Sequence, residues 1–72
     1  MPELPVLTAR QVIQALSVLG FTTLRQRGSH LQMRRGNRMA TVPLHRGDIP
    51  PGTLKSILRQ AGITVQELID SL

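Results

Sequence analysis

The spacing of apolar residues divides the chain into a helical beginning, an alternating middle and a helical end. In residues 8–21, apolar side chains recur every three or four positions, which is typical of an amphipathic helix. Thr8 and Gln11 have the spacing of a capping box at its start. Gly20 lies where a left-handed residue commonly ends a helix, and Phe21 would then pack back on the last turn.

The middle of the chain alternates between apolar and polar side chains, as strands with one buried face do. Gly36-Asn37 is a signal for a two-residue hairpin, and Arg27-Gly28 predicts a second turn. We therefore expect a meander of three short antiparallel strands. These strands cover residues 22–26, 29–35 and 39–44.

Alternation also assigns the faces of these strands. Leu31 and Met33 share one face of the second predicted strand, and Leu24 takes the same side in the first. Because these apolar side chains would face the core, the polar residues between them would face outward. The outward face is expected to carry Thr23, Arg25, His30, Gln32 and Arg34.

Two helices complete the chain. Apolar residues at helical spacing predict one helix over residues 52–62, which Gly62 ends. Thr64 and Glu67 form another capping box, which starts a short helix that runs to Leu72. The order α-β-β-β-α-α predicts an α+β fold, with one three-stranded antiparallel sheet and the helices on one face. Residues 1–72 would form a single domain.

The composition narrows the class of protein. A chain of 72 residues without cysteine has one small core, little room for a deep pocket, and neither disulfides nor a cysteine-bound zinc. It contains no apolar run long enough to span a membrane. Its first ten residues lack the basic and apolar pattern of a signal peptide, so a cytoplasmic location is expected.

Positive charge dominates more than half of the chain. Nine basic residues oppose four acidic ones, and seven arginines lie between Glu3 and Asp48 without a carboxylate among them. Such a field attracts polyanions, and the arginine fork suits phosphate. Phe21 is the only aromatic residue, so base stacking would contribute little. The candidate phosphate contacts are Arg25, Arg27, Arg34, Arg35, Lys55 and Arg59.

Few enzyme chemistries fit these residues. The four carboxylates are scattered, so neither a two-metal nuclease site nor another cofactor is expected. His45 and Asp48 sharing a metal in a loop is a weak alternative. A nucleophilic pair of Ser29 with His30 is also weak, because neighbours on a strand point to opposite faces.

RNA cleavage needs fewer groups, because RNA carries its own nucleophile, the 2′-OH. A base that removes its proton allows attack on the adjacent phosphate, and nearby cations stabilise the developing charge. Histidine exchanges protons near neutral pH, so His30 is a candidate. A surface histidine that only contacts phosphate or backbone is the other interpretation. His45 has the same two interpretations, whereas Gly28 and Ser29 fit a turn.

The combination of LGF, RGSH, VPLH and PPGTLKSILRQAGIT resembles the HicA family of toxins from bacterial toxin–antitoxin systems. The resemblance covers roughly residues 8–70. It implies a fold like that of double-stranded RNA-binding domains and ribosome-independent cleavage of mRNA. It also implies that His30, which follows Gly28 and Ser29, is the catalytic residue.

The same resemblance implies a HicB antitoxin as partner, which would cover the face of His30 with a partial RNase H-like domain. It leaves the role of His45 open. Two alternatives remain beside the nuclease. One is a non-enzymatic RNA-binding module, since a fold does not fix a function. The other is an inactive subunit that only binds an antitoxin.

Overall fold

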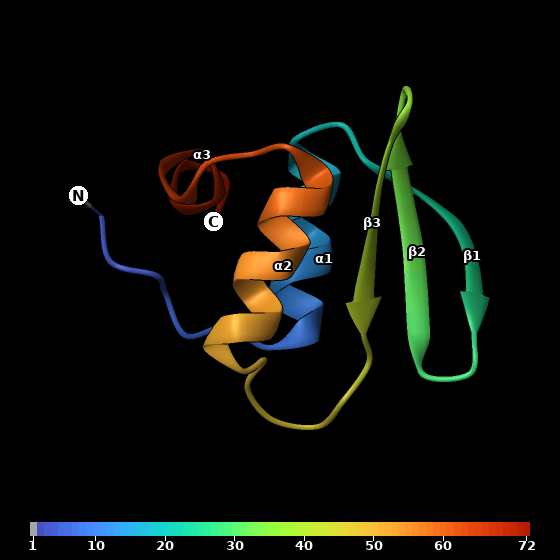
Figure 1. Cartoon of the computed structure of the whole chain (residues 1–72), viewed down its shortest axis with the longest axis horizontal. Coiled ribbons are helices and arrows are strands. Elements are labelled where there is room, and N and C mark those ends of the chain that lie inside the picture. The colour runs from blue at the N-terminus through green and yellow to red at the C-terminus, as the bar shows by residue number, and fades with distance from the viewer. Residues whose placement is uncertain (1) are drawn as a thin grey trace.

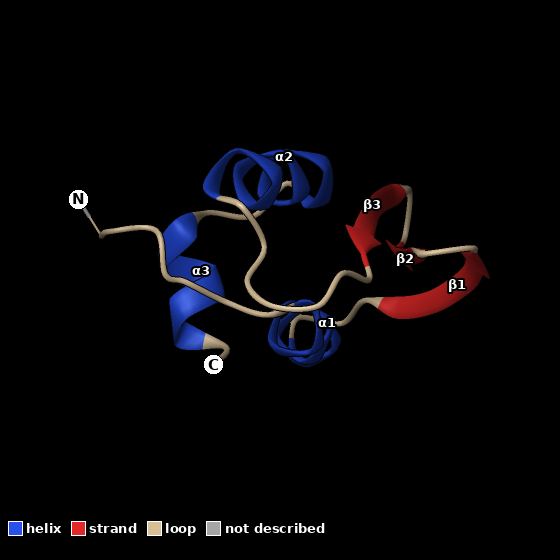
Figure 2. Cartoon of the chain, turned by 90° about the horizontal axis from the view of Figure 1, so that it is seen from below, coloured by secondary structure: helices blue, strands red, loops and turns tan. Residues whose placement is uncertain are grey.

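A three-stranded antiparallel sheet lies beside a layer of helices in the computed structural model, which describes residues 2–72 (Figures 1 and 2). The strands follow one another in chain order across the sheet. The predicted α+β fold and its order α-β-β-β-α-α are confirmed. The elements are α1 (Ala9–Val18), β1 (Thr22–Arg27), β2 (His30–Arg35), β3 (Arg38–Pro43), α2 (Pro51–Ala61) and α3 (Val65–Asp70).

The ends of the helices follow the capping signals in the sequence. The Thr8 side chain accepts from the backbone of Gln11, whose side chain accepts from the Thr8 N–H at 2.9 Å. At the other end of α1, the Phe21 N–H donates to the Leu16 carbonyl at 2.9 Å, and Phe21 is 2% exposed. The predicted capping box of Thr64 also forms at the start of α3. None of the helices within residues 2–72 is long and apolar enough to cross a bilayer.

The core fills the space between the sheet and the helices. Strand β2 contributes Leu31 and Met33, and β3 contributes Ala40 and Val42 from its side facing the helices. Strand β1 lies farthest from the helices, and all six of its residues are exposed (Figure 1). The helices contribute, among others, Val12, Leu16, Leu54, Ile57 and Leu58.

Both strand connections are two-residue turns that begin with glycine. Gly28 has a φ of 55° and Gly36 has a φ of 59°, whereas the residues that follow them have no positive φ. This is the pattern of type II′ turns, whose first central position favours glycine. The turn at Gly36-Asn37 lies at its predicted position. The other lies one residue later than predicted, at Gly28-Ser29, so Arg27 is the last residue of β1.

A β-bulge in β1 changes the predicted faces of that strand. Thr23 pairs with Met33, but the next pair is Arg25 with Gln32, so Leu24 is the extra residue. The prediction for Leu24 and Thr23 was therefore wrong. Thr23 lies on the side of the helices, and Leu24 is 43% exposed instead of facing the core.

Two arginines at the Gly36 hairpin lie at the C-terminal ends of helices. Arg35 donates from Nη1 to the Leu19 carbonyl at 2.8 Å, and its guanidinium carbon lies 4.8 Å from the centre of the Phe21 ring. The Arg38 guanidinium lies against Gly62, where an added Cβ would be 2.8 Å from its Cζ. Cations at these ends oppose the partial negative charge of the helix dipole. These two side chains therefore support the fold.

The contacts of Arg35 give a prediction about stability. Replacing Arg35 with Ala removes a charge-assisted hydrogen bond and a cation–π contact, so the free energy of unfolding should fall by about 1–2 kcal/mol. The neighbouring variant Arg34→Ala should cost less, about 0.5 kcal/mol, because its hydrogen bond to the Gly36 carbonyl is local and solvent-exposed and is joined by no cation–π contact. Urea unfolding of both variants measures the difference, and equal costs would contradict the structural role of Arg35.

Candidate functional site

The sheet face turned away from the helices is an open surface on which strand pairing sets side chains in three cross-strand rows. We call this surface the open face. The row beside the Gly28 turn holds Arg27, His30 and Pro43; the middle row holds Arg25, Gln32 and Thr41; the far row holds Thr22, Arg34 and Met39.

His30 is the first residue of β2 and is exposed. Its position follows from its neighbour, because Leu31 packs in the core and consecutive side chains of a strand point to opposite faces. Arg27 lies directly opposite His30 on β1. Such cross-strand pairs have Cβ atoms about 5 Å apart, so a basic side chain flanks the imidazole.

The bulge at Leu24 decides which side chains of β1 share the face of His30. Without the extra residue, pairing inward from Thr22 would place Leu24 and Gln26 on the open face. With it, Arg25 and Arg27 lie there instead. Bulges commonly redirect side chains next to functional sites, and this one adds two positive charges to the surface.

Ser29 and the loop after β3 meet beside His30. The Leu44 N–H donates to the Ser29 carbonyl, with N and O 2.6 Å apart. This bond joins the residue before His30 to the residue before His45, so both histidines lie at the same end of the sheet. The side chain of His45 is exposed. Ser29 lies in the turn, where it completes the type II′ geometry.

The other two open-face arginines are bound to neighbouring groups. Arg25 donates from Nε to the Gln32 Oε1 at 2.9 Å, across the middle row. Arg34 donates from Nε to the carbonyl of Gly36 at 2.9 Å. Beside Arg34, a shallow hollow of about 310 Å³ opens on the surface. Its lining is formed by Arg34, Gly36, Asn37 and Met39.

Three of the predicted phosphate contacts lie elsewhere. Arg35 is on the side of the helices and is bound to α1. Gln60 of α2 accepts from the backbone N–H of Thr41, so its flank of the helix faces β3. Helical spacing places Lys55 and Arg59 on the opposite flank. The structure thus places Arg25, Arg27 and Arg34 on the same face of the sheet as His30, whereas Lys55 and Arg59 lie on α2.

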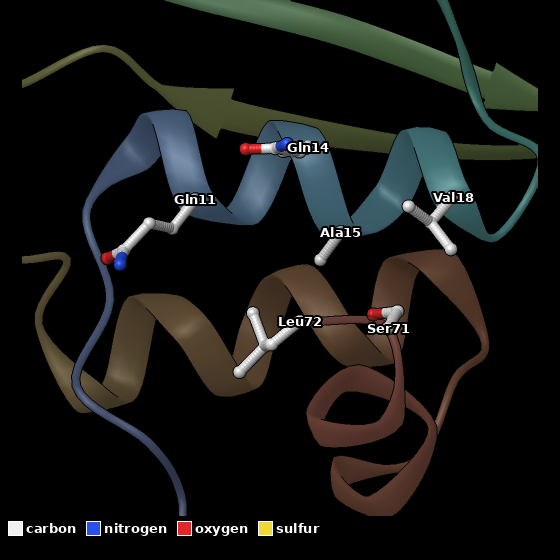
Figure 3. A pocket seen from close by; sticks show the side chains of 6 residues that line it. All are labelled: Gln11, Gln14, Ala15, Val18, Ser71 and Leu72. Atoms are coloured by element: carbon white, nitrogen blue, oxygen red, sulfur yellow. The ribbon is translucent and has the colours of Figure 1, made fainter.

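A second hollow, of about 410 Å³, lies on the helical side of the molecule between α1 and the end of the chain (Figure 3). None of its lining side chains is charged, and neither histidine contributes to it. Within residues 2–72, no three metal-binding side chains come together either. The lining residues are Gln11, Gln14, Ala15, Val18, Ser71 and Leu72.

Comparison of the amino-acid sequence with known protein families finds a match. The family profile described as HicA toxin of bacterial toxin-antitoxin matches residues 9–63. The chain belongs to the HicA toxin family. The match runs from the start of α1 to just beyond α2, so it includes the whole open face and both histidines. Membership implies a toxin that acts together with an antitoxin. No curated protein sequence matches the chain significantly.

The two type II′ turns of this HicA toxin provide a matched test of the His30 end of the sheet. Gly28→Ala and Gly36→Ala each place a Cβ at positive φ with open space around it. Each should therefore lower the free energy of unfolding by about 1–2 kcal/mol. If the toxic action depends on His30, only Gly28→Ala should strongly reduce toxicity on induced expression, because relaxation of that turn displaces His30 relative to Arg27. Equal toxicity of both variants would contradict this dependence.

Proposed function

We propose that this HicA toxin is an endoribonuclease that cleaves mRNA without a metal ion and uses His30 for proton transfer. The observation that carries this proposal is the placement of an exposed histidine beside Arg27 on an arginine-lined face. Pure RNA binding needs arginines but not a histidine at that position. The resemblance to the family further suggests that the cleavage of mRNA does not require the ribosome.

The proposed reaction uses the 2′-OH of the RNA as nucleophile. Loss of its proton allows O2′ to attack the adjacent phosphorus, and the P–O5′ bond breaks. Two proton transfers are needed, one from O2′ and one to O5′, and an imidazole can perform either. His45 lies at the same end of the sheet and is the candidate for the second transfer. The products are a 2′,3′-cyclic phosphate and a 5′-OH.

Binding would depend mainly on the RNA backbone. Arg25, Arg27 and Arg34 project from the open face, where they can contact successive phosphates. Phe21, the only aromatic side chain, is buried and cannot stack on a base. Lys55 and Arg59 would contact only RNA that reaches past the sheet to α2. The shallow, open surface suits an extended or looped RNA strand.

The antitoxin partner would be a HicB-like protein that covers the open face in the cytoplasm. A surface with three arginines favours a partner with carboxylates opposite them. The exposed side chain of Met39 would add an apolar contact at that interface. A protein bound there would exclude RNA from His30 by occupying the same surface.

Substitution of His30 tests the catalytic role. His30→Ala should change the free energy of unfolding by no more than about 0.5 kcal/mol, because the side chain is exposed. RNA cleavage should fall by about 10²–10⁴-fold, the usual effect of removing a general acid or base. RNA binding should persist because the arginines remain. Cleavage of labelled RNA and a binding titration measure both effects.

The matched variant His45→Ala separates the two histidines. A large loss of cleavage in His45→Ala with little loss in His30→Ala would move the catalytic role to His45. If the unchanged protein binds RNA but does not cleave it, the chain is a binding module. If it neither binds nor cleaves RNA but binds the antitoxin, it is an inactive partner subunit.

Treatment with a chelator and a modified substrate test the mechanism. Cleavage should persist in excess EDTA, because the proposed reaction uses side chains alone. RNA with a 2′-O-methyl group at the cleaved position should resist, because it lacks the nucleophile. Mass spectrometry of the fragments should find the 2′,3′-cyclic phosphate or its hydrolysis product. Loss of activity in EDTA that magnesium restores would contradict a metal-independent reaction.

A further inference from the structure

We infer that Arg27 binds the phosphate group that reacts beside His30, and so contributes to the chemical step and not only to RNA affinity. This inference rests on the proposed function, since it assigns one group within the same site. It distinguishes Arg27 from Arg25 and Arg34, which would contact phosphates farther along the strand.

The first support is position. Arg27 and His30 form the last cross-strand pair before the Gly28-Ser29 turn, on the same face. Arg25 lies one row farther along, which is about 7 Å for two residues of a strand. A phosphate within reach of the imidazole therefore lies next to Arg27. For Arg25, that spacing corresponds more closely to a neighbouring phosphate of the same RNA.

The second support is the state of the guanidinium. Arg25, Arg34 and Arg35 each donate a hydrogen bond to another group of the protein. For Arg27, no protein acceptor is found among residues 2–72. All five N–H donors of its guanidinium are then available to an anion, in the fork geometry that matches two oxygens of one phosphate.

The third support is the rigidity of the backbone that carries the pair. The two-residue type II′ turn fixes the relative position of Arg27 and His30. The Gln26 Nε2 donates to the carbonyl of Gly28 at 3.0 Å and braces the turn from the side of the helices. The extra residue at Leu24 shifts the alternation of side chains along β1 by one, so that Arg27 points outward. The backbone therefore sets the base of the Arg27 side chain beside His30 before any RNA binds.

In the proposed reaction, the O2′–P bond forms while the P–O5′ bond breaks, one proton leaves O2′ and one reaches O5′. Nothing is oxidised or reduced. Negative charge increases on the non-bridging oxygens of the phosphate as the five-coordinate state forms. A guanidinium that donates to these oxygens stabilises that state more than the ground state, which accelerates the reaction.

Kinetics with a single-stranded RNA oligonucleotide test the inference. Arg27→Ala should lower kcat by about 10²–10³-fold with KM changed only several-fold, because the lost donor acts in the transition state. The matched variant Arg25→Ala should instead raise KM and largely keep kcat. Arg27→Lys should recover part of the lost kcat, since it restores charge without the fork. If Arg27→Ala raises only KM, as Arg25→Ala does, the inference is wrong.

A second measurement separates this inference from the proposed function. Inorganic phosphate at constant ionic strength should shift the NMR signals of the His30 ring in the unchanged protein and in Arg25→Ala, but not in Arg27→Ala. If that result is found and no RNA is cleaved, the anion site stands while the proposed nuclease function fails. If RNA is cleaved but the phosphate effect and kcat do not depend on Arg27, the nuclease stands and the inference fails.

Discussion

The burial of Leu31 and Met33 in the central strand is the constraint on which the rest of the structure depends. Strand β2 is paired on both sides, so its register determines which residues of β1 and β3 share each face. A shift of one residue would turn His30 and Arg34 into the core and expose both apolar side chains. Packing of these two residues against the helices therefore holds the open face in place.

The arginines of this toxin have two different uses that are close together in the chain. Arg34 and Arg35 are neighbours, yet one projects from the open face and the other binds the end of α1. Arg38 also lies against a helix end, at Gly62. The positive charge of the sequence therefore serves both the fold and the surface. Charge alone would overestimate the number of arginines available to a ligand.

The open face suits the proposed reaction in so small a protein. It has no deep pocket, but the proposed reaction takes its nucleophile from the substrate and needs only proton transfer and positive charge. The same exposure makes the site easy to block, because any partner that covers the sheet also covers His30. An acidic antitoxin and RNA would be attracted by the same arginines, so they would exclude each other.

The local sequence determined the helix caps, the Gly36-Asn37 turn and the candidate histidine, because these depend on residues only a few positions apart, and it placed the first hairpin turn within one residue. Counting outward from the Gly36-Asn37 turn also pairs His30 with Pro43, as the structure does. That register places the segment of His45 beside the start of the second strand. Counting from the turn could therefore have predicted that the two histidines lie at the same end of the sheet, whereas the alternation pattern could not.

Only the tertiary structure decided where the bulge lies and which of the remaining basic residues share the face of His30. Nothing in the residues around Leu24 marks it as the extra residue, because a bulge depends on how an edge strand fits its partner and the core beyond it. Lys55 and Arg59 matched a phosphate site by type and spacing. They lie away from His30 because the orientation of α2 is set by its apolar packing and by the bond of Gln60 to β3, which join residues far apart in the sequence.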